Sequence, residues 1–256
     1  MEVHFFFLLP MAFLLQPETW AWQIIGGHEA KPHSRPYMAY LRVRRATKHN
    51  QCGGFLVAEN FVLTAAHCQG DSIHVTLGAH NIKQQEPSQQ VIEVQRQIPH
   101  PQYNWETKIN DIMLLQLQCK AESNGYVGLL SLPAAPQRVR PGTKCSVAGW
   151  GQMSASNEQI SETLQEADVV VMPDADCRRK RGGPWRSYNA TTMMCVGDPE
   201  EGRSPFQGDS GGPLVCGEEA QGIVSLGSED GIPPAVYTKV STFLPWIQET
   251  MKKLES

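Results

Sequence analysis

A serine set among glycines is the feature that most constrains this chain. Residues 208–213 read Gly-Asp-Ser-Gly-Gly-Pro, which places Ser210 on a sharp turn where no neighbouring side chain blocks its hydroxyl. A serine hydroxyl is a weak nucleophile, and it reacts only with a base within hydrogen-bond reach and a third group that orients the base. A fold that uses Ser210 in this way must bring a histidine and an acid to the same point.

The order of the candidate histidine and acid along the chain narrows the choice among the known classes of serine hydrolase. Every histidine precedes Ser210, and the last is His100, which excludes the α/β-hydrolase order with its histidine after the serine. The first aspartate, Asp71, follows His67, so His67 does not fit the subtilisin order either. What remains is the order histidine, aspartate, serine, with His67 in Thr-Ala-Ala-His-Cys and Asp111 in Asn-Asp-Ile-Met-Leu-Leu.

Three more stretches extend this pattern. Residues 24–27 read Ile-Ile-Gly-Gly, residues 32–40 read Pro-His-Ser-Arg-Pro-Tyr-Met-Ala-Tyr, and residues 77–82 read Leu-Gly-Ala-His-Asn-Ile. Together with the three segments above, they resemble the trypsin/chymotrypsin-fold serine proteases, and among these the granzymes B and H, mast-cell chymase and cathepsin G. The resemblance covers nearly everything from Ile24 to the end. It implies an all-β fold of two antiparallel six-stranded barrels that meet at a cleft, with a C-terminal α-helix.

The resemblance also implies a role for each residue of the centre. His67 is the expected base, Asp111 orients its imidazole, and Ser210 is the nucleophile of a serine endopeptidase. The backbone N–H groups of Gly208 and Ser210 are expected to form the oxyanion hole. Asp209 is costly to bury unpaired, so we expect an amine freed at Ile24 to fold in and pair with it.

The expected substrate pocket carries no charge at its base or its wall. A neutral, open slot favours cleavage after Phe, Tyr, Trp, Leu or Met, because burying such a side chain contributes about 1.5–3 kcal/mol. Two alternatives stay open, namely a granzyme-like cytotoxic protease with a different first-pocket preference and a catalytically silent granule binding protein. By resemblance, the residues around the pocket are Ser204, Gln207, Ser225, Leu226, Gly227 and Ala235.

Short apolar runs separated by turn residues favour an all-β body. A helix is predicted from Ser241 to about residue 255, with Pro245 in its first turn. The proline-rich stretch 129–141 is the expected crossing between an N-terminal barrel of about residues 24–130 and a C-terminal barrel of about residues 131–240. Strands are predicted at residues 55–57, 61–64, 73–77, 112–117, 145–148, 169–172, 222–226 and 235–240.

The N-terminus is typical of a secretory signal peptide. The apolar run Phe5–Leu15 is too short to span a bilayer, and small residues near Ala21 favour cleavage there. This leaves Trp22-Gln23, which resembles the activation dipeptide that a dipeptidyl peptidase removes, before a peptidase domain of residues 24–256. The alternative, a buried N-terminal strand, would leave Ile24 without a free amine. We expect a product without a membrane span, secreted or stored in cytoplasmic granules of immune cells.

Cysteine usage agrees with an oxidising compartment, since seven cysteines are present. The sequence alone leaves their connectivity open. Cys119 is expected to be a buried free thiol at a strand end, and the alternative is an intermolecular disulfide. Asn189-Ala190-Thr191 is a glycosylation sequon, and we expect it to be used. The resemblance implies the disulfides Cys52–Cys68, Cys145–Cys216 and Cys177–Cys195.

Charge limits the expected partners. The net charge is −4 and the pI is about 6.1, so we expect neither strong heparin binding nor a nucleic-acid partner. Ala79 stands where calcium-binding trypsins have a carboxylate, so we expect no metal ion, and we expect no cofactor. Protein or peptide substrates and serpin inhibitors are the partners that the resemblance implies. A basic run is read as a solvated loop: Arg178, Arg179, Lys180, Arg181 and Arg186.

Overall fold

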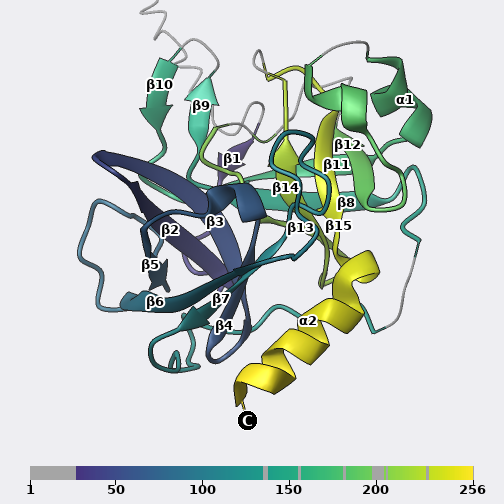
Figure 1. The fold of residues 1–256 in the computed structure, drawn as a ribbon. Coiled ribbons are helices and arrows are strands. Elements are labelled where there is room, and N and C mark those ends of the chain that lie inside the picture. Colours follow the sequence, from purple (N-terminus) through teal and green to yellow (C-terminus); the bar gives the residue numbers. More distant parts are fainter. Residues whose placement is uncertain are drawn as a thin grey trace, which may run out of the picture.

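Two antiparallel β-barrels stand side by side, and one long helix lies beneath them (Figure 1). The structure, a computed structural model, describes residues 27–134, 138–154, 157–180, 183–197, 205, 207–228 and 231–255. Ile24 and Ser204 lie outside the described residues. No helix among those that are described is both long and apolar enough to cross a membrane.

The first barrel closes six strands in the order β2-β3-β4-β7-β6-β5. Its interior is filled by alternate residues of the strands, among them Leu41, Phe55, Phe61 and Leu114, all without exposed surface. The strands are β2 Met38–Arg45, β3 Lys48–Ala58, β4 Phe61–Thr64, β5 Ser72–Leu77, β6 Gln90–Pro99 and β7 Met113–Leu117.

The second barrel closes because β8 pairs with β13 on one side and with β11 on the other. The short strand β1, His28–Glu29, adds to the edge of β11, and β9, Gln152–Ser154, forms a hairpin with β10, Asn157–Ile160. The two closed barrels confirm the predicted fold class. The barrel strands are β8 Lys144–Gly149, β11 Gln165–Val171, β12 Met193–Gly197, β13 Pro213–Cys216, β14 Glu219–Leu226 and β15 Ala235–Lys239.

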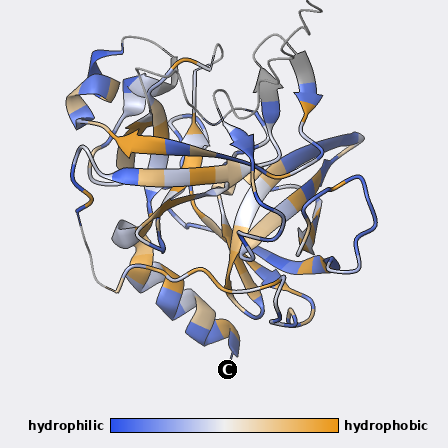
Figure 2. Cartoon of the chain, turned by 180° about the vertical axis from the view of Figure 1, so that it is seen from behind, coloured by the Kyte–Doolittle hydropathy of each residue, from blue (hydrophilic) through white to orange (hydrophobic). Residues whose placement is uncertain are grey.

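The C-terminal helix α2, Val240–Glu255, follows the last strand of the second barrel and packs against both the first barrel and β14 of the second. Its apolar face, including Phe243 and Ile247, joins the core cluster of the first barrel. The ring of His100 lies 5.1 Å from those of Phe243 and Trp246. Figure 2 shows hydrophobic and hydrophilic residues alternating along this helix, as an amphipathic docking helix requires. The helix therefore ties the two barrels together.

Some local predictions need correction. The helix begins at Val240, so Pro245 lies in its second turn and not in the first. The barrel strands β2, β6, β12 and β13 were not predicted. In β6 only Ile92 is buried, which leaves little hydrophobic alternation to detect. The short helices α1, Asp174–Arg179, and η2, Gly183–Ser187, were not predicted either. All eight predicted strands are found, and those at 61–64, 73–77, 112–117, 145–148 and 235–240 agree within one residue at each end. The predictions at 55–57, 169–172 and 222–226 cover only the later part of β3, β11 and β14, which begin seven, four and three residues earlier.

The cysteines pair as the resemblance implies. Disulfides join Cys52 to Cys68, Cys145 to Cys216 and Cys177 to Cys195. The expectation of a buried thiol at Cys119 is wrong, because this side chain is exposed. Strand β7 ends at Leu117, so the chain has already left the barrel wall when it reaches Cys119.

Candidate active site

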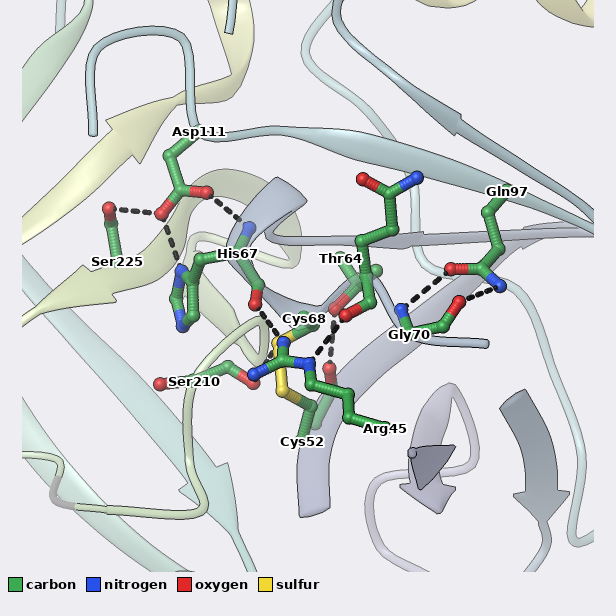
Figure 3. The surroundings of a disulfide bond; sticks show 12 residues. Arg45, Cys52, Thr64, His67, Cys68, Gly70, Gln97, Asp111, Ser210 and Ser225 are labelled. Atoms are coloured by element: carbon green, nitrogen blue, oxygen red, sulfur yellow. Dashed lines mark hydrogen bonds and ion pairs between the residues drawn. A yellow bond between two sulfur atoms is a disulfide. The ribbon is translucent and has the colours of Figure 1, made fainter. Parts of the chain in front are cut away.

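His67 and Asp111 come together from two segments of the first barrel, one that follows β4 and one that precedes β7. The short 3₁₀ helix η1, Ala66–Cys68, follows β4 and carries His67, whereas Asp111 lies just before β7. His67 Nδ1 lies 2.7 Å from Asp111 Oδ2, and the backbone N–H of His67 donates to Oδ1 over 2.9 Å (Figure 3). Both carboxylate oxygens therefore hold His67, which fixes the orientation of its ring.

Asp111 is also held from the second barrel. Its side chain has no exposed surface, and Ser225 Oγ, on β14, donates to Oδ2 over 2.5 Å. Thr238 Oγ1, on β15, donates to the backbone carbonyl of Asp111 over 2.8 Å. Burial raises the pKa of the Asp111 carboxyl, but the charge and hydrogen bonds of His67 and the Ser225 bond outweigh it, so the pKa is lowered. The group therefore stays ionised and can stabilise an imidazolium.

Ser210 and His67 line one groove of about 410 Å³ together with Gly208. The carbonyl of Ser210 accepts a 2.8 Å hydrogen bond from the N–H of Gly53, on the first barrel. Gly208 has a φ of +97°, and a Cβ there would lie 2.5 Å from Gln51 Nε2. That Cβ would also lie 2.9 Å from the backbone Cα of Gly151. The turn before Ser210 therefore requires glycine, because the positive φ would strain a side chain and the backbone of Gly151 leaves no room for it.

Asp209 points away from the groove into the second barrel. It is 2% exposed, and its Oδ1 accepts a 2.8 Å hydrogen bond from the N–H of Gly151. A Cβ on Gly149 would lie only 2.1 Å from that oxygen, so the carboxylate occupies space that a side chain would take. Burial raises the pKa of Tyr237 well above its ordinary value, and the charge of Asp209 adds to this. A buried carboxylate thus lies next to Ser210, on the side away from the groove.

A second, smaller cavity of about 150 Å³ opens beside Ser210. Ala235 is fully buried on β15, where it pairs with Val196, and is not among the residues that line this cavity. Ser204, the predicted base of the pocket, lies outside the described residues. The structure therefore brings four of the six predicted pocket residues to the cavity, and every described residue of its lining is uncharged: Pro205, Gln207, Ser210, Val224, Ser225, Leu226, Gly227 and Ser228.

The disulfide Cys52–Cys68 lies directly against His67. Ligand atoms of Cys52, Cys68 and His67 fall within 4.8 Å of one another, a spacing that could suggest a metal site. The two sulfur atoms are bonded to each other, so neither is a thiolate that could bind a metal ion. The cluster instead fixes η1 to β3.

Two residues of this centre were missed by reasoning from the sequence. Ser225 was placed in the pocket, but its hydroxyl also holds Asp111, and the one signal was a lone hydroxyl in the apolar run Gly222–Leu226. Arg45 donates to the backbone carbonyl of His67 and, over 2.7 Å, to that of Gln69. Nothing in the sequence around Arg45 indicates this contact.

The predicted glycosylation site and basic run lie away from the groove. Asn189 is exposed after η2, and its Oδ1 accepts a 3.0 Å hydrogen bond from the N–H of Thr191. Arg179 lies 3.5 Å from Asp176 on α1, and Lys180 lies 5.0 Å from the Trp185 ring. Arg181 lies outside the described residues. Two cations of the run, Arg179 and Lys180, are thus already partnered at the surface.

Comparison with known proteins agrees with this geometry. The trypsin family matches residues 24–247. Human granzyme H is 56% identical over 97% of this chain and 99% of its own length, and human cathepsin G is 51% identical over 97% and 95%. A solved structure, "Structure of GrC", is 48% identical, has a TM-score of 0.84 and covers 89% of this chain and 99% of its own. The chain belongs to the trypsin family and is a serine protease of the group that includes granzymes, mast cell proteases and cathepsin G.

Proposed function

We propose that this protein is a secreted or granule-stored serine endopeptidase that cleaves after large apolar residues by an acyl-enzyme mechanism. One observation carries the proposal. His67, fixed by both oxygens of a buried, ionised Asp111, opens onto the same groove as Ser210. This is the arrangement that a serine needs to become a nucleophile near neutral pH.

The mechanism uses these groups in turn. Asp111 accepts from His67 Nδ1, which leaves Nε2 to take the proton as Ser210 Oγ attacks the scissile carbonyl. The N–H groups of Gly208 and Ser210 stabilise the oxyanion of the tetrahedral intermediate. His67 then gives the proton to the leaving amine, and the acyl-enzyme remains. Water, activated by the same imidazole, releases the acyl group and restores the Ser210 hydroxyl.

Substrate preference follows from the small cavity beside Ser210. Its described lining carries hydroxyl, amide and apolar groups but no charge, so a lysine, arginine or acidic side chain would lose hydration without finding an ionic partner there. Gly227 contributes no side chain that would close the opening. The proposed specificity is therefore cleavage after Phe, Tyr, Trp, Leu or Met.

Activation is proposed to depend on Asp209. A buried carboxylate needs a cation or several hydrogen bonds, and the N–H of Gly151 supplies one of them. An ammonium freed at Ile24 by removal of Trp22-Gln23 would pair with Asp209 and order the loop that carries Gly208 and Ser210. The proposed activator is a dipeptidyl peptidase.

Localisation in the secretory pathway is proposed from the apolar run at Phe5–Leu15 and from the three disulfides, which are typical of oxidising compartments. Relatives that carry the names granzyme and mast cell protease support storage in granules of immune cells. Serpins are the proposed inhibitors, and a glycan at the exposed Asn189 is proposed to face solvent.

A peptide library tests the specificity. The chain beginning at Ile24 is incubated with the library, and cleavage sites are read by mass spectrometry, with Ser210→Ala as the control for contaminating proteases. We expect enrichment of Phe, Tyr, Trp, Leu and Met immediately before the cleaved bond. Cleavage after acidic or basic residues would favour the granzyme-like alternative, and no cleavage by the wild type would favour the silent binding protein.

A further inference from the structure

The larger groove beside Ser210 has no substrate group assigned to it so far. It shares Ser210 and Gln207 with the small cavity and extends past His67 to Arg45 and Gln51. On the proposed function, the side chain before the scissile bond enters the small cavity. Since both spaces meet at Ser210, the groove of about 410 Å³ must receive the residues that follow the scissile bond.

Among the described residues that line this groove, Arg45 is the one with a permanently charged side chain. It is exposed at the end of β2, and its guanidinium is held in place by the carbonyls of His67 and Gln69 (Figure 3). Two backbone carbonyls fix a guanidinium without neutralising it. In the described part of the chain, no carboxylate lies within ion-pair distance of Arg45.

The surroundings add to this positive charge. Lys48 is the direct cross-strand partner of Arg45 in the hairpin of β2 and β3. The nearby carboxylate of Asp71 is engaged elsewhere, because its Oδ2 accepts a 2.6 Å hydrogen bond from the N–H of Ala46. The charge of Arg45 also reaches across the site, since burial lowers the pKa of Lys108 and Arg45 lowers it further, against the effect of Asp111. This end of the groove is therefore cationic.

We propose that Arg45 is a specificity-determining residue that selects substrates with a carboxylate on the leaving-group side of the scissile bond. A guanidinium fits a carboxylate through paired N–H donors, and it stays charged at every relevant pH. The carboxylate can come from an acidic side chain or from the free C-terminus of a short peptide. Both sources have the same chemistry, and the experiment separates them.

The test compares peptides that share one acyl side and differ after the scissile bond. One series carries glutamate or glutamine at the second or third leaving-group position with an amidated C-terminus, and the other carries only neutral residues with a free or amidated C-terminus. We expect kcat/KM for glutamate to exceed that for glutamine by about twofold to fivefold, mostly through KM, as for exposed ion pairs. The ratio should shrink as salt is raised.

Three variants assign the effect to Arg45. Arg45→Gln should bring the ratio close to one, Arg45→Lys should keep part of it, and Arg44→Gln should leave the ratio unchanged. Arg44 is the matched control because it is the neighbouring exposed arginine of the same strand, points to the other face and donates to Ser72 Oγ over 3.1 Å. Each ratio is normalised to hydrolysis of a p-nitroanilide, which has no residue on the leaving-group side, so any general loss through His67 cancels.

The outcomes separate the inference from the function on which it rests. A ratio near one in an active wild type would overturn the inference and leave the proposed function intact. A ratio kept by Arg45→Gln would also overturn it. If the wild type cleaves neither the peptides nor the p-nitroanilide, both fail together. A preference for a free C-terminus alone would assign Arg45 to the terminal carboxylate and reject the acidic side chain.

Discussion

The two barrels hold their parts of the site by different means. On the first barrel, His67 and Asp111 are joined by hydrogen bonds of 2.7 and 2.9 Å, and the second barrel secures Asp111 through Ser225. On the second barrel, Ser210 lies on a turn whose shape depends on Gly208 and on close backbone contact with Gly53. His67 and Asp111 are thus fixed by side-chain hydrogen bonds, whereas the position of Ser210 depends on neighbouring glycines that leave room for close backbone contacts.

This difference indicates where control can act. The pair of His67 and Asp111 is complete within the described chain, so it needs no further event to form. The turn of Ser210 stands over the buried carboxylate of Asp209, whose proposed cationic partner arises only when residues 22–23 are removed. On the proposed activation, a change in the second barrel would therefore switch on a centre in which His67 and Asp111 are already in place.

The largest expected effect comes from breaking the first-barrel pair. In Asp111→Asn the amide would hold His67 in the wrong tautomer, so its Nε2 could not accept the Ser210 proton. We expect kcat to fall about 10⁴-fold with little change in KM, as for triads in general. Steady-state kinetics on a p-nitroanilide measure this, and a loss below tenfold would show that Asp111 is not the orienting acid.

Substitution of Gly208, in the turn before Ser210 on the second barrel, should lower kcat almost as much, but for a steric reason. Gly208→Ala places a Cβ 2.9 Å from the backbone Cα of Gly151 at a φ of +97°, so the backbone must shift, and the proposed oxyanion donors with it. We expect kcat to fall about 10²–10³-fold, the usual cost of losing one such donor. Gly217→Ala is the matched control, because Gly217 also has a positive φ, of +59°, but nothing lies within 4 Å of its Cβ position. Equal losses in both variants would contradict the steric account.

The hydrogen bond from Ser225 to Asp111 joins the two barrels, and we expect its removal to have a smaller effect on kcat. Ser225→Ala removes the 2.5 Å hydrogen bond to Asp111 but leaves the bonds to His67. We expect about a tenfold loss in kcat, because a hydrogen bond to a charged group contributes about 1.5–3 kcal/mol and two partners of the carboxylate remain. The same variant should change the preference among apolar side chains, because Ser225 also lines the small cavity. Kinetics with matched Phe and Leu substrates would detect both effects.

Low pH should reduce the contribution of the Asp111–His67 pair to the stability of the fold. The pKa of Asp111 is lowered in the folded protein from its ordinary value of 3.8, so the carboxylate stabilises the fold above that value. This stabilisation is lost as the pH falls through the lower, folded-state value. We expect urea unfolding to show a difference between wild type and Asp111→Asn at pH 7 that shrinks at pH 3. A difference that grows in acid would mean that burial, and not His67, dominates this carboxyl.

The sequence alone was sufficient to predict the parts of the site that lie in short local motifs. The surroundings of His67, Asp111 and Ser210 were sufficient to place them in one fold, and the apolar runs predicted eight of the strands. Contacts between residues that are far apart in the sequence could not be predicted in this way. Ser225 and Asp111 are 114 positions apart, and Arg45 meets His67 only because a hairpin curves back over η1. Such contacts depend on how two closed barrels pack, for which no local pattern exists.

Labelling of Ser210 by a fluorophosphonate tests the central claim most directly. The chain beginning at Ile24 is treated with the reagent, and the modified residue is identified by peptide mass spectrometry, with His67→Ala as the comparison. We predict one adduct per molecule, at Ser210, formed rapidly by the wild type and very slowly by His67→Ala. An adduct elsewhere, or equal rates in the two proteins, would contradict the assignment of Ser210 as a nucleophile activated by His67.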